Sequence, residues 1–224
     1  MDSSSQPTST NRPSLVTLAL TSLIDLDTRL SLYLHSLFLP FPRSLLKLLE
    51  ISGDGRFWFP IPISLFWFAD PKLKIFSLFL LVGSLLDLAL VGLLKFTIRR
   101  PRPVYNKGMH LTVGVDHWSF PSGHSSRACF VGFFLWLCSD LIEEFFDGWS
   151  FMSGLKSWEF VRGDWMIDLH GGFRFAGLVV LWSVATSFSR VLLGRHFVLD
   201  VMAGAMLGVL EALFMFHFFR WYSN

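Results

Sequence analysis

The chain has 224 residues, of which 52% are hydrophobic and only 16% are charged. A soluble domain carries about 25% charged residues, so this deficit and the mean hydropathy of +0.51 favour a membrane protein. The 19 Lys and Arg residues nearly balance the 17 Asp and Glu residues, and no basic run indicates a nucleic-acid partner. The length suits one compact helical domain.

The first 14 residues are polar and predict a disordered tail, which leaves residues 15–224 for the folded domain. No basic region leads into a long apolar core, so we predict no cleaved signal peptide. The expected location is the endoplasmic reticulum or another endomembrane. A plastid transit peptide stays open as an alternative, because the tail is rich in Ser and Thr and holds only one acidic residue, Asp2.

Residues 15–39 are apolar at both ends but polar in the middle. Residues 25–29, with the sequence Asp-Leu-Asp-Thr-Arg, are too polar for a helix that faces lipid all round. Two interpretations stay open: an amphipathic helix that lies in the membrane interface, or a first span with its polar side turned inward.

Four later segments are candidate spans, judged against the roughly 20 apolar residues that a spanning helix needs. Residues 75–94 and 197–219 are long enough, and residues 128–142 and 175–188 become full spans if their polar ends reach a shared site. A fifth span is expected from residues 45–69, kinked near two prolines, Pro60 and Pro62. The sequence thus predicts an all-α, polytopic transmembrane bundle with five spans, or six if residues 15–39 also cross.

Two further features receive no chemical role. Cys129 and Cys138 lie in one apolar run and are expected to face lipid or pack, since no Cys spacing typical of a metal site occurs. The acidic and aromatic loop at residues 139–172 is assigned no function. The sequence does not indicate which oligomeric state the chain has.

Polar residues gather in three clusters at the ends of these spans. The clusters are Lys95 with Arg102 and Pro103, then the Pro-Ser-Gly-His run at residues 121–124, and then Ser189 and Arg190 with His196 and Asp200. With residues 75–94, 128–142, 175–188 and 197–219 as successive spans, all three clusters emerge on one face of the membrane. The first cluster alone fits a membrane anchor and the second a turn. The third is more specific, because His and Asp beside a span are costly to bury without a purpose. Together the three clusters favour a site.

Three cations and two small residues in these clusters suit a phosphate group. Arg102 and Arg190 each offer a planar fork that matches phosphate oxygens, and Lys95 adds a point charge. Ser122 and the Gly123 amide can donate further hydrogen bonds, and a helix that begins near His124 would direct its positive end at an anion. No set of metal ligands is visible, so the cations would replace Mg²⁺ and no cofactor is predicted.

The two histidines suit nucleophilic and acid–base catalysis. His196 and Asp200 are four residues apart, which places them on one face if that segment is helical. A carboxylate bonded to one ring nitrogen would fix the tautomer and leave the other nitrogen free to attack phosphorus. His124 could then protonate the leaving alkoxide and later activate water.

In these three clusters the chain resembles the type 2 phosphatidic acid phosphatase superfamily, which includes lipid phosphate phosphatases and, more distantly, vanadium haloperoxidases. The resemblance covers residues 20–220 and is sharpest at residues 95–103, 121–124 and 189–200. The short chain and residues 49–58 are similar to the plant lipid phosphate phosphatase beta type and to polyisoprenoid and presqualene diphosphate phosphatases.

The resemblance implies a PAP2/haloperoxidase-like core, a lipid phosphate substrate and Mg²⁺-independent hydrolysis through a phosphohistidine. It implies His196 as nucleophile, His124 as acid and Asp200 as the residue that orients His196. The residues it implies for phosphate binding are Lys95, Arg102, Ser122, Gly123 and Arg190. Phosphatidate and isoprenoid diphosphates are both expected as substrate classes.

Two other functions stay open at this stage. The same site could transfer a phosphoryl or phospho head group to a lipid alcohol, or the chain could be a non-catalytic scaffold or anion-binding protein. Pure binding needs no nucleophile, which argues against the second. Other charged residues near the clusters are expected to have no direct catalytic role. Arg99 and Arg100 are expected to steer substrate, and Arg127 and Arg195 to lie at the interface or touch phosphate. Asp87 and Glu211 are expected to pair with neighbours or to face a cavity in the bundle.

Overall fold

The computed structural model describes residues 14–68, 70–105, 117–142, 144 and 171–223. Most of the predicted tail and most of the acidic loop lie outside these ranges. The helices are α1 (Leu15–Leu37), α2 (Arg43–Ser52), α3 (Gly55–Trp58), α4 (Pro60–Phe68), α5 (Pro71–Ile98), α6 (Gly123–Leu137), α9 (Gly171–Leu192) and α10 (Val198–Ser223). The described ranges contain no strand, and the all-α prediction is confirmed for them.

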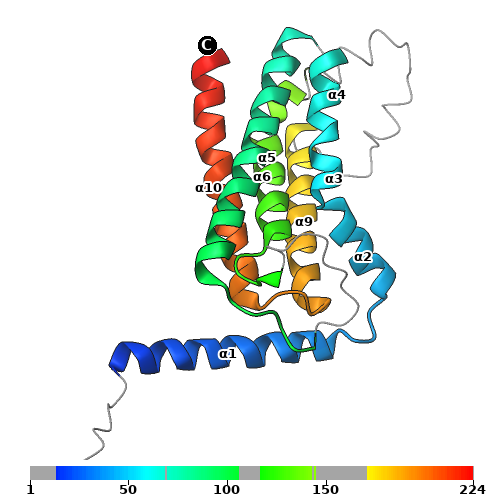
Figure 1. Ribbon diagram of the computed structural model, residues 1–224. Helices are drawn as coiled ribbons and strands as arrows, with labels where there is room; N and C mark the ends of the chain where they lie inside the picture. The colour runs from blue at the N-terminus through cyan, green and yellow to red at the C-terminus, as the bar shows by residue number, and fades with distance from the viewer. Residues whose placement is uncertain (1–13, 69, 106–116, 143, 145–170, 224) are drawn as a thin grey trace, which may run out of the picture.

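The helices form an upright bundle with one helix lying across its end (Figure 1). Four helices, α5, α6, α9 and α10, run along the bundle side by side, and α2, α3 and α4 follow one another along one flank. The first helix, α1, lies across the end where α5 and α9 finish and where α6 and α10 begin.

Two helices in the described part of the chain are long and apolar enough to cross a membrane. They are α5 and the first 25 residues of α10, Val198–Tyr222. The apolar part of α9, Gly177–Leu192, is shorter, and α6 has 15 residues. The predicted total of five or six spans is therefore not confirmed by length and composition.

The predicted kinked span at residues 45–69 is instead a column of three short helices. The chain breaks at Gly53 and Asp54, where the Asp54 carboxylate caps α3 by accepting the Arg56 N–H at 2.9 Å. Pro60 and Pro62 lie in the first turn of α4. Proline is tolerated there because the first N–H groups of a helix have no partner within it. The breaks therefore precede the prolines rather than coincide with them.

Close contact between α6 and α10 depends on two glycines four residues apart. A Cβ atom at Gly204 would lie 2.4 Å from the Ser122 carbonyl oxygen, and one at Gly208 would lie 2.0 Å from the Ser126 carbonyl oxygen. Small residues at this spacing let two helix backbones approach closely. The two glycines thus bring the start of α10 against the start of α6.

The interior of the bundle is aromatic toward the end far from α1. Phe76 stacks on Phe134, which in turn stacks on Phe130, with ring centroids 5.5 and 5.8 Å apart. Cys129 and Cys138 are buried and free, so their predicted packing role is confirmed. Large apolar side chains also cover the outside of α5 and α10, among them Leu85, Leu93, Met206 and Leu210. A membrane would cover this outer apolar surface.

Candidate active site

The three polar clusters lie at the end of the bundle that faces α1. Lys95 is in the last turn of α5, Ser122 caps the start of α6, Arg190 is in the last turn of α9, and Asp200 is in the first turn of α10. Helices that run alternately up and down the bundle bring these ends together (Figure 1). The three clusters thus share one end of the bundle.

A tight turn between α9 and α10 places His196. Gly194 has a φ of +73°, a left-handed conformation that glycine adopts without strain. The N–H groups of Arg195 and His196 both donate to the Arg190 carbonyl, at 2.9 and 3.3 Å. His196 therefore precedes α10 instead of lying on it, and the expectation that His196 and Asp200 share a helical face is wrong.

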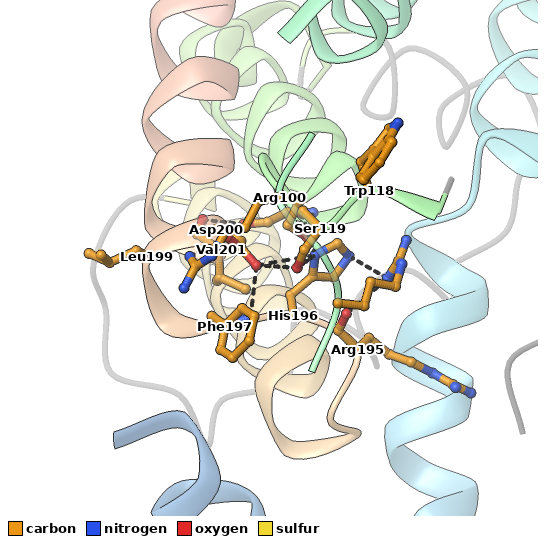
Figure 2. Close-up of polar contacts among 12 residues, drawn as sticks. Arg100, Trp118, Ser119, Arg195, His196, Phe197, Leu199, Asp200 and Val201 are labelled. Atoms are coloured by element: carbon orange, nitrogen blue, oxygen red, sulfur yellow. Dashed lines mark hydrogen bonds and ion pairs between the residues drawn. The ribbon is translucent and has the colours of Figure 1, made fainter. Parts of the chain in front are cut away.

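The contacts of the His196 ring define which nitrogen can react. Its Nδ1 lies 2.8 Å from the Ser119 carbonyl oxygen (Figure 2), and its Nε2 lies 3.3 Å from Arg102 Nη1. A carbonyl can only accept, so Nδ1 carries the proton. The lone pair then belongs to Nε2, which faces a cation.

Asp200 binds groups beside His196 and not the imidazole itself. Its Oδ2 lies 3.8 Å from His196 Nδ1, beyond hydrogen-bond distance, so the expected direct bond is absent. That oxygen accepts from the Ser119 hydroxyl and, at 2.9 Å, from the Phe197 N–H. Ser119 thus stands between the carboxylate and the imidazole, donating to one and accepting from the other (Figure 2).

The charges of the predicted cations act on the two imidazoles. The charges of Lys95 and Arg190 act on both His124 and His196, and the two imidazoles also interact electrostatically with each other. Lys95 Nζ donates to the Trp118 carbonyl at 3.0 Å, and Arg102 Nη1 donates to the Arg195 carbonyl at 2.8 Å. These main-chain contacts hold the two side chains in place.

The start of α6 has the form expected of an anion site. Ser122 is its N-cap, and the helix begins at Gly123, close to the predicted start at His124. The Ser122 N–H donates to the Asp200 carbonyl at 2.9 Å, which ties this cap to α10. The Ser122 hydroxyl accepts from the Ser125 N–H at 3.4 Å and keeps its own proton for another acceptor.

Sequence reasoning missed Glu50, which lies on α2. Its carboxylate forms an ion pair with Arg190, and its Oε1 lies 3.6 Å from Arg195 Nε. Arg190 is fully buried and Arg195 is 6% exposed, so Arg195 is not an interfacial side chain. The only signal was the position of Glu50 in residues 49–58, the run that carried part of the family resemblance.

Ser119 and Arg100 were also missed. Arg100, expected only to steer substrate, donates to Asp200 Oδ1 and to Asp27 Oδ2, each at 2.7 Å. Ser119 lies directly before the Phe-Pro-Ser-Gly-His run, and Arg100 lies two residues before Arg102. Their nearness to the clusters was the available signal.

Arg127 and two buried acids lie inside the bundle, and the charge of Arg127 also acts on His124. Arg127 Nη2 lies 3.3 Å from Asp87 Oδ2, which confirms the expectation that Asp87 pairs with a neighbour. Glu211 is buried on α10, 3% exposed, and interacts electrostatically with both. An ionised group inside a bundle is stable only near such partners.

The pKa of His196 predicts how stability depends on pH. Burial lowers this pKa well below 6.5, and the charges of Arg102, Arg190 and Lys95 lower it further. In the unfolded chain the pKa returns to about 6.5, so below that pH the unfolded state binds a proton that the folded state does not. We expect the free energy of unfolding to fall as the pH decreases from about 6.5. Thermal unfolding in detergent at several pH values, for wild type and His196→Gln, measures this; an equal fall in both chains contradicts it.

Comparison with known proteins agrees with this geometry. The family model described as "PAP2 superfamily" matches residues 76–223. A "Probable lipid phosphate phosphatase beta" of Arabidopsis thaliana is 41% identical over 213 residues, which cover 93% of this chain and 95% of that protein. These matches include all three clusters.

Two solved structures share the fold. A transmembrane PAP2-type phosphatidylglycerolphosphate phosphatase from Bacillus subtilis superposes with a TM-score of 0.65 at 22% identity, covering 88% of this chain and 86% of that one. The LpxE protein of Aquifex aeolicus superposes with a TM-score of 0.55 at 21% identity, covering 84% and 93%. With the family match over most of the bundle, these findings identify the chain as a member of the PAP2 superfamily and as a membrane-associated phosphoric monoester hydrolase.

Proposed function

We propose that the chain hydrolyses the phosphate ester or diphosphate of a membrane lipid through a phosphohistidine formed on His196. The observation that carries the proposal is the tautomer of the His196 ring, with the proton on Nδ1. Nδ1 is bound to the Ser119 carbonyl at 2.8 Å, which leaves the Nε2 lone pair directed toward Arg102. A phosphate held by Arg102 would therefore meet the nucleophilic nitrogen.

In the first step, His196 Nε2 forms a bond to phosphorus and the bond from phosphorus to the lipid oxygen breaks. The leaving oxygen takes a proton from His124, which acts as the general acid. The phosphorylated ring gains positive charge, and the Asp200 carboxylate, 3.8 Å from Nδ1, stabilises that charge. Ser119 keeps the ring from rotating.

In the second step, water attacks the phosphohistidine. Neutral His124 removes a proton from the water, the new oxygen–phosphorus bond forms, and the bond from phosphorus to Nε2 breaks. Inorganic phosphate leaves and both histidines return to their starting states. The proton that His124 lost in the first step is thereby replaced.

The charge of the phosphate would be balanced by side chains instead of Mg²⁺. Lys95, Arg102 and Arg190 supply three positive charges, while Ser122 and the Gly123 N–H at the start of α6 supply hydrogen bonds. Arg190 is already held by Glu50 and Arg102 by the Arg195 carbonyl, so these groups need little rearrangement to bind. Such preorganisation is the main way in which an enzyme stabilises a phosphoryl-transfer transition state.

The substrate would reach this site from the bilayer. We propose that α5, α6, α9 and α10 cross the membrane with the α2–α4 column as a fifth crossing, because apolar side chains cover the outside of the bundle. The relatives are a probable lipid phosphate phosphatase and a phosphatidylglycerolphosphate phosphatase. Phosphatidate and isoprenoid diphosphates both combine a terminal phosphate with an apolar tail.

Phosphate release by the purified chain in detergent tests the proposal. With EDTA present, we expect release from phosphatidate or farnesyl diphosphate in mixed micelles, and much slower release from water-soluble glycerol 3-phosphate. Adding a lipid alcohol and analysing the products separates hydrolysis from transfer to that alcohol. Release that requires added Mg²⁺, or no release from any lipid phosphate, contradicts the proposal.

A further inference from the structure

One face of α1 changes from apolar to polar along the helix. Residues three or four apart share a face, and this face carries Val16, Leu20, Leu23, Asp27, Ser31 and His35. The polar half contacts the bundle. Ser31 Oγ accepts the Val198 N–H at 2.9 Å, Asp27 Oδ1 accepts the Leu199 N–H at 3.0 Å, and His35 Nδ1 lies 2.8 Å from the Leu192 carbonyl.

The apolar half of the same face projects past the bundle (Figure 1). Val16, Leu20 and Leu23 are 68%, 54% and 47% exposed. The same face contacts the start of α10 farther along α1, so its apolar residues lie on the side of α1 that faces the bundle end. A bilayer around α5 and α10 would therefore cover them. Ser22 and Asp25 lie on the opposite, exposed face. A helix with lipid above it and water below it would have this pattern.

The polar half of α1 also reaches the active site through Arg100. This guanidinium lies between two carboxylates, with Nη2 2.7 Å from Asp27 Oδ2 and Nη1 2.7 Å from Asp200 Oδ1. It also lies over the Phe197 ring, 4.1 Å from the centroid. Both carboxylates are buried, and paired charges out of water hold their geometry strongly. Asp200 cannot turn without breaking this bridge.

We propose that α1 lies in the interface of the bilayer and that it positions Asp200 beside His196. The positioning acts through a bridge: Asp27 on α1 binds Arg100, and Arg100 binds the Asp200 carboxylate. Asp27 and Arg100 are then positioning residues, since neither contacts the reacting nitrogen. The inference rests on the proposed function of the site. It also explains why the middle of α1 is polar: Asp27 serves the active site and is not in lipid.

Spin labels at single cysteines test the location of α1. In phosphatidylcholine vesicles, labels at Leu20→Cys and Leu23→Cys should be more accessible to oxygen than to a water-soluble nickel chelate. Labels at Ser22→Cys and Asp25→Cys should show the reverse. Three results would each overturn the interfacial location. They are access of the nickel chelate to labels at residues 20 and 23, a label depth that increases steadily along α1 as in a span, and dipolar broadening from a second copy of the chain.

Kinetics of bridge variants test the positioning role. We expect Asp27→Asn to lower kcat about tenfold and Arg100→Gln about a hundredfold, with KM within about twofold, because a misplaced catalytic group slows the reaction more than it weakens binding. Asp25→Asn, on the exposed face of the same helix, should match wild type. Asp27→Glu should restore most of kcat, because it restores the carboxylate.

The pH profile separates positioning from a general loss of structure. The charged groups that face His196 are Lys95 on α5, Arg102 after it, His124 on α6, Arg190 on α9 and Asp200 on α10. Without Arg100, the Asp200 charge is less compensated and favours protonated His196. The acid limb of the kcat/KM profile should therefore move to higher pH in Arg100→Gln and stay in place in Asp25→Asn.

The outcomes distinguish this inference from the proposed function. Wild-type kcat in both Asp27→Asn and Arg100→Gln, with an active wild-type chain, overturns the positioning role and leaves the function intact. No activity in wild type overturns the function itself. If Arg100→Gln does not fold, the Asp27→Asn and Asp27→Glu pair still decides, because Asn keeps an oxygen for the Leu199 N–H.

Discussion

Replacing His196 by alanine should lower phosphate release by at least about a thousandfold, because the proposed mechanism then lacks its nucleophile. The chain should still insert and be recovered from detergent as a folded protein, since α9 and α10 pack through other residues. Release of inorganic phosphate from phosphatidate micelles measures the effect. His217→Ala, which changes an exposed histidine on α10, is the matched control and should keep wild-type activity.

Replacing His124 tests whether the phosphohistidine intermediate accumulates when the proposed acid–base residue is missing. With a lipid substrate, His124→Asn should be nearly inactive, because the poor leaving group needs a proton. With a nitrophenyl phosphate, whose leaving group needs none, phosphoenzyme should form and persist, since water is not activated. The intermediate should be acid-labile and stable to base, as a phosphohistidine is. A base-labile intermediate, or turnover by His196→Ala at the wild-type rate, contradicts the mechanism.

The parts of the fold that could be predicted are those with local signals. Long apolar runs predicted α5 and α10, because hydrophobicity over about 20 residues is a property of the segment itself. The three polar clusters could be placed at one end of the bundle because successive spans alternate in direction. A helix was expected to begin near His124, and α6 begins one residue earlier, at Gly123 with Ser122 as its N-cap.

The parts that could not be predicted depend on contacts between distant residues. Asp27 and Arg100 are 73 positions apart, and nothing in either segment indicates the other. The proton on His196 Nδ1 depends on the Ser119 carbonyl, a main-chain group that every residue has. Local spacing placed His196 and Asp200 on one helix, because it does not reveal the turn that Gly194 makes.

The polar middle of α1 could be recognised in the sequence, but it did not decide whether the helix spans the membrane. Residues 25–29 excluded a helix that faces lipid all round, and two interpretations stayed open: an interfacial amphipathic helix or a first span with its polar side turned inward. In the structure Asp27 pairs with Arg100, and α1 lies across the end of the bundle (Figure 1). This arrangement supports the interfacial location that we propose above.

Replacing Gly208 by alanine should destabilise the fold by about 3 kcal/mol, or lower the unfolding midpoint by about 6–12 °C. The new Cβ would lie 2.0 Å from the Ser126 carbonyl oxygen, so α6 and α10 must move apart. Gly92→Ala is the matched control: it is the same change within a helix, and nothing lies within 4 Å of its Cβ. It should be neutral or slightly stabilising. Thermal unfolding in detergent compares the three chains.

Gly204→Ala should reduce activity as well as stability, because its Cβ would press on the Ser122 carbonyl at 2.4 Å. Ser122 caps the helix that carries His124, and its N–H donates to the Asp200 carbonyl. A shift of α6 away from α10 would therefore move His124, the proposed general acid, away from His196, the proposed nucleophile, which precedes α10. Equal kcat in Gly204→Ala and Gly92→Ala would mean that the two histidines are held together by something other than this helix contact. The proposed mechanism therefore makes the close approach of α6 and α10, which needs residues without a Cβ, a condition for catalysis as well as for packing.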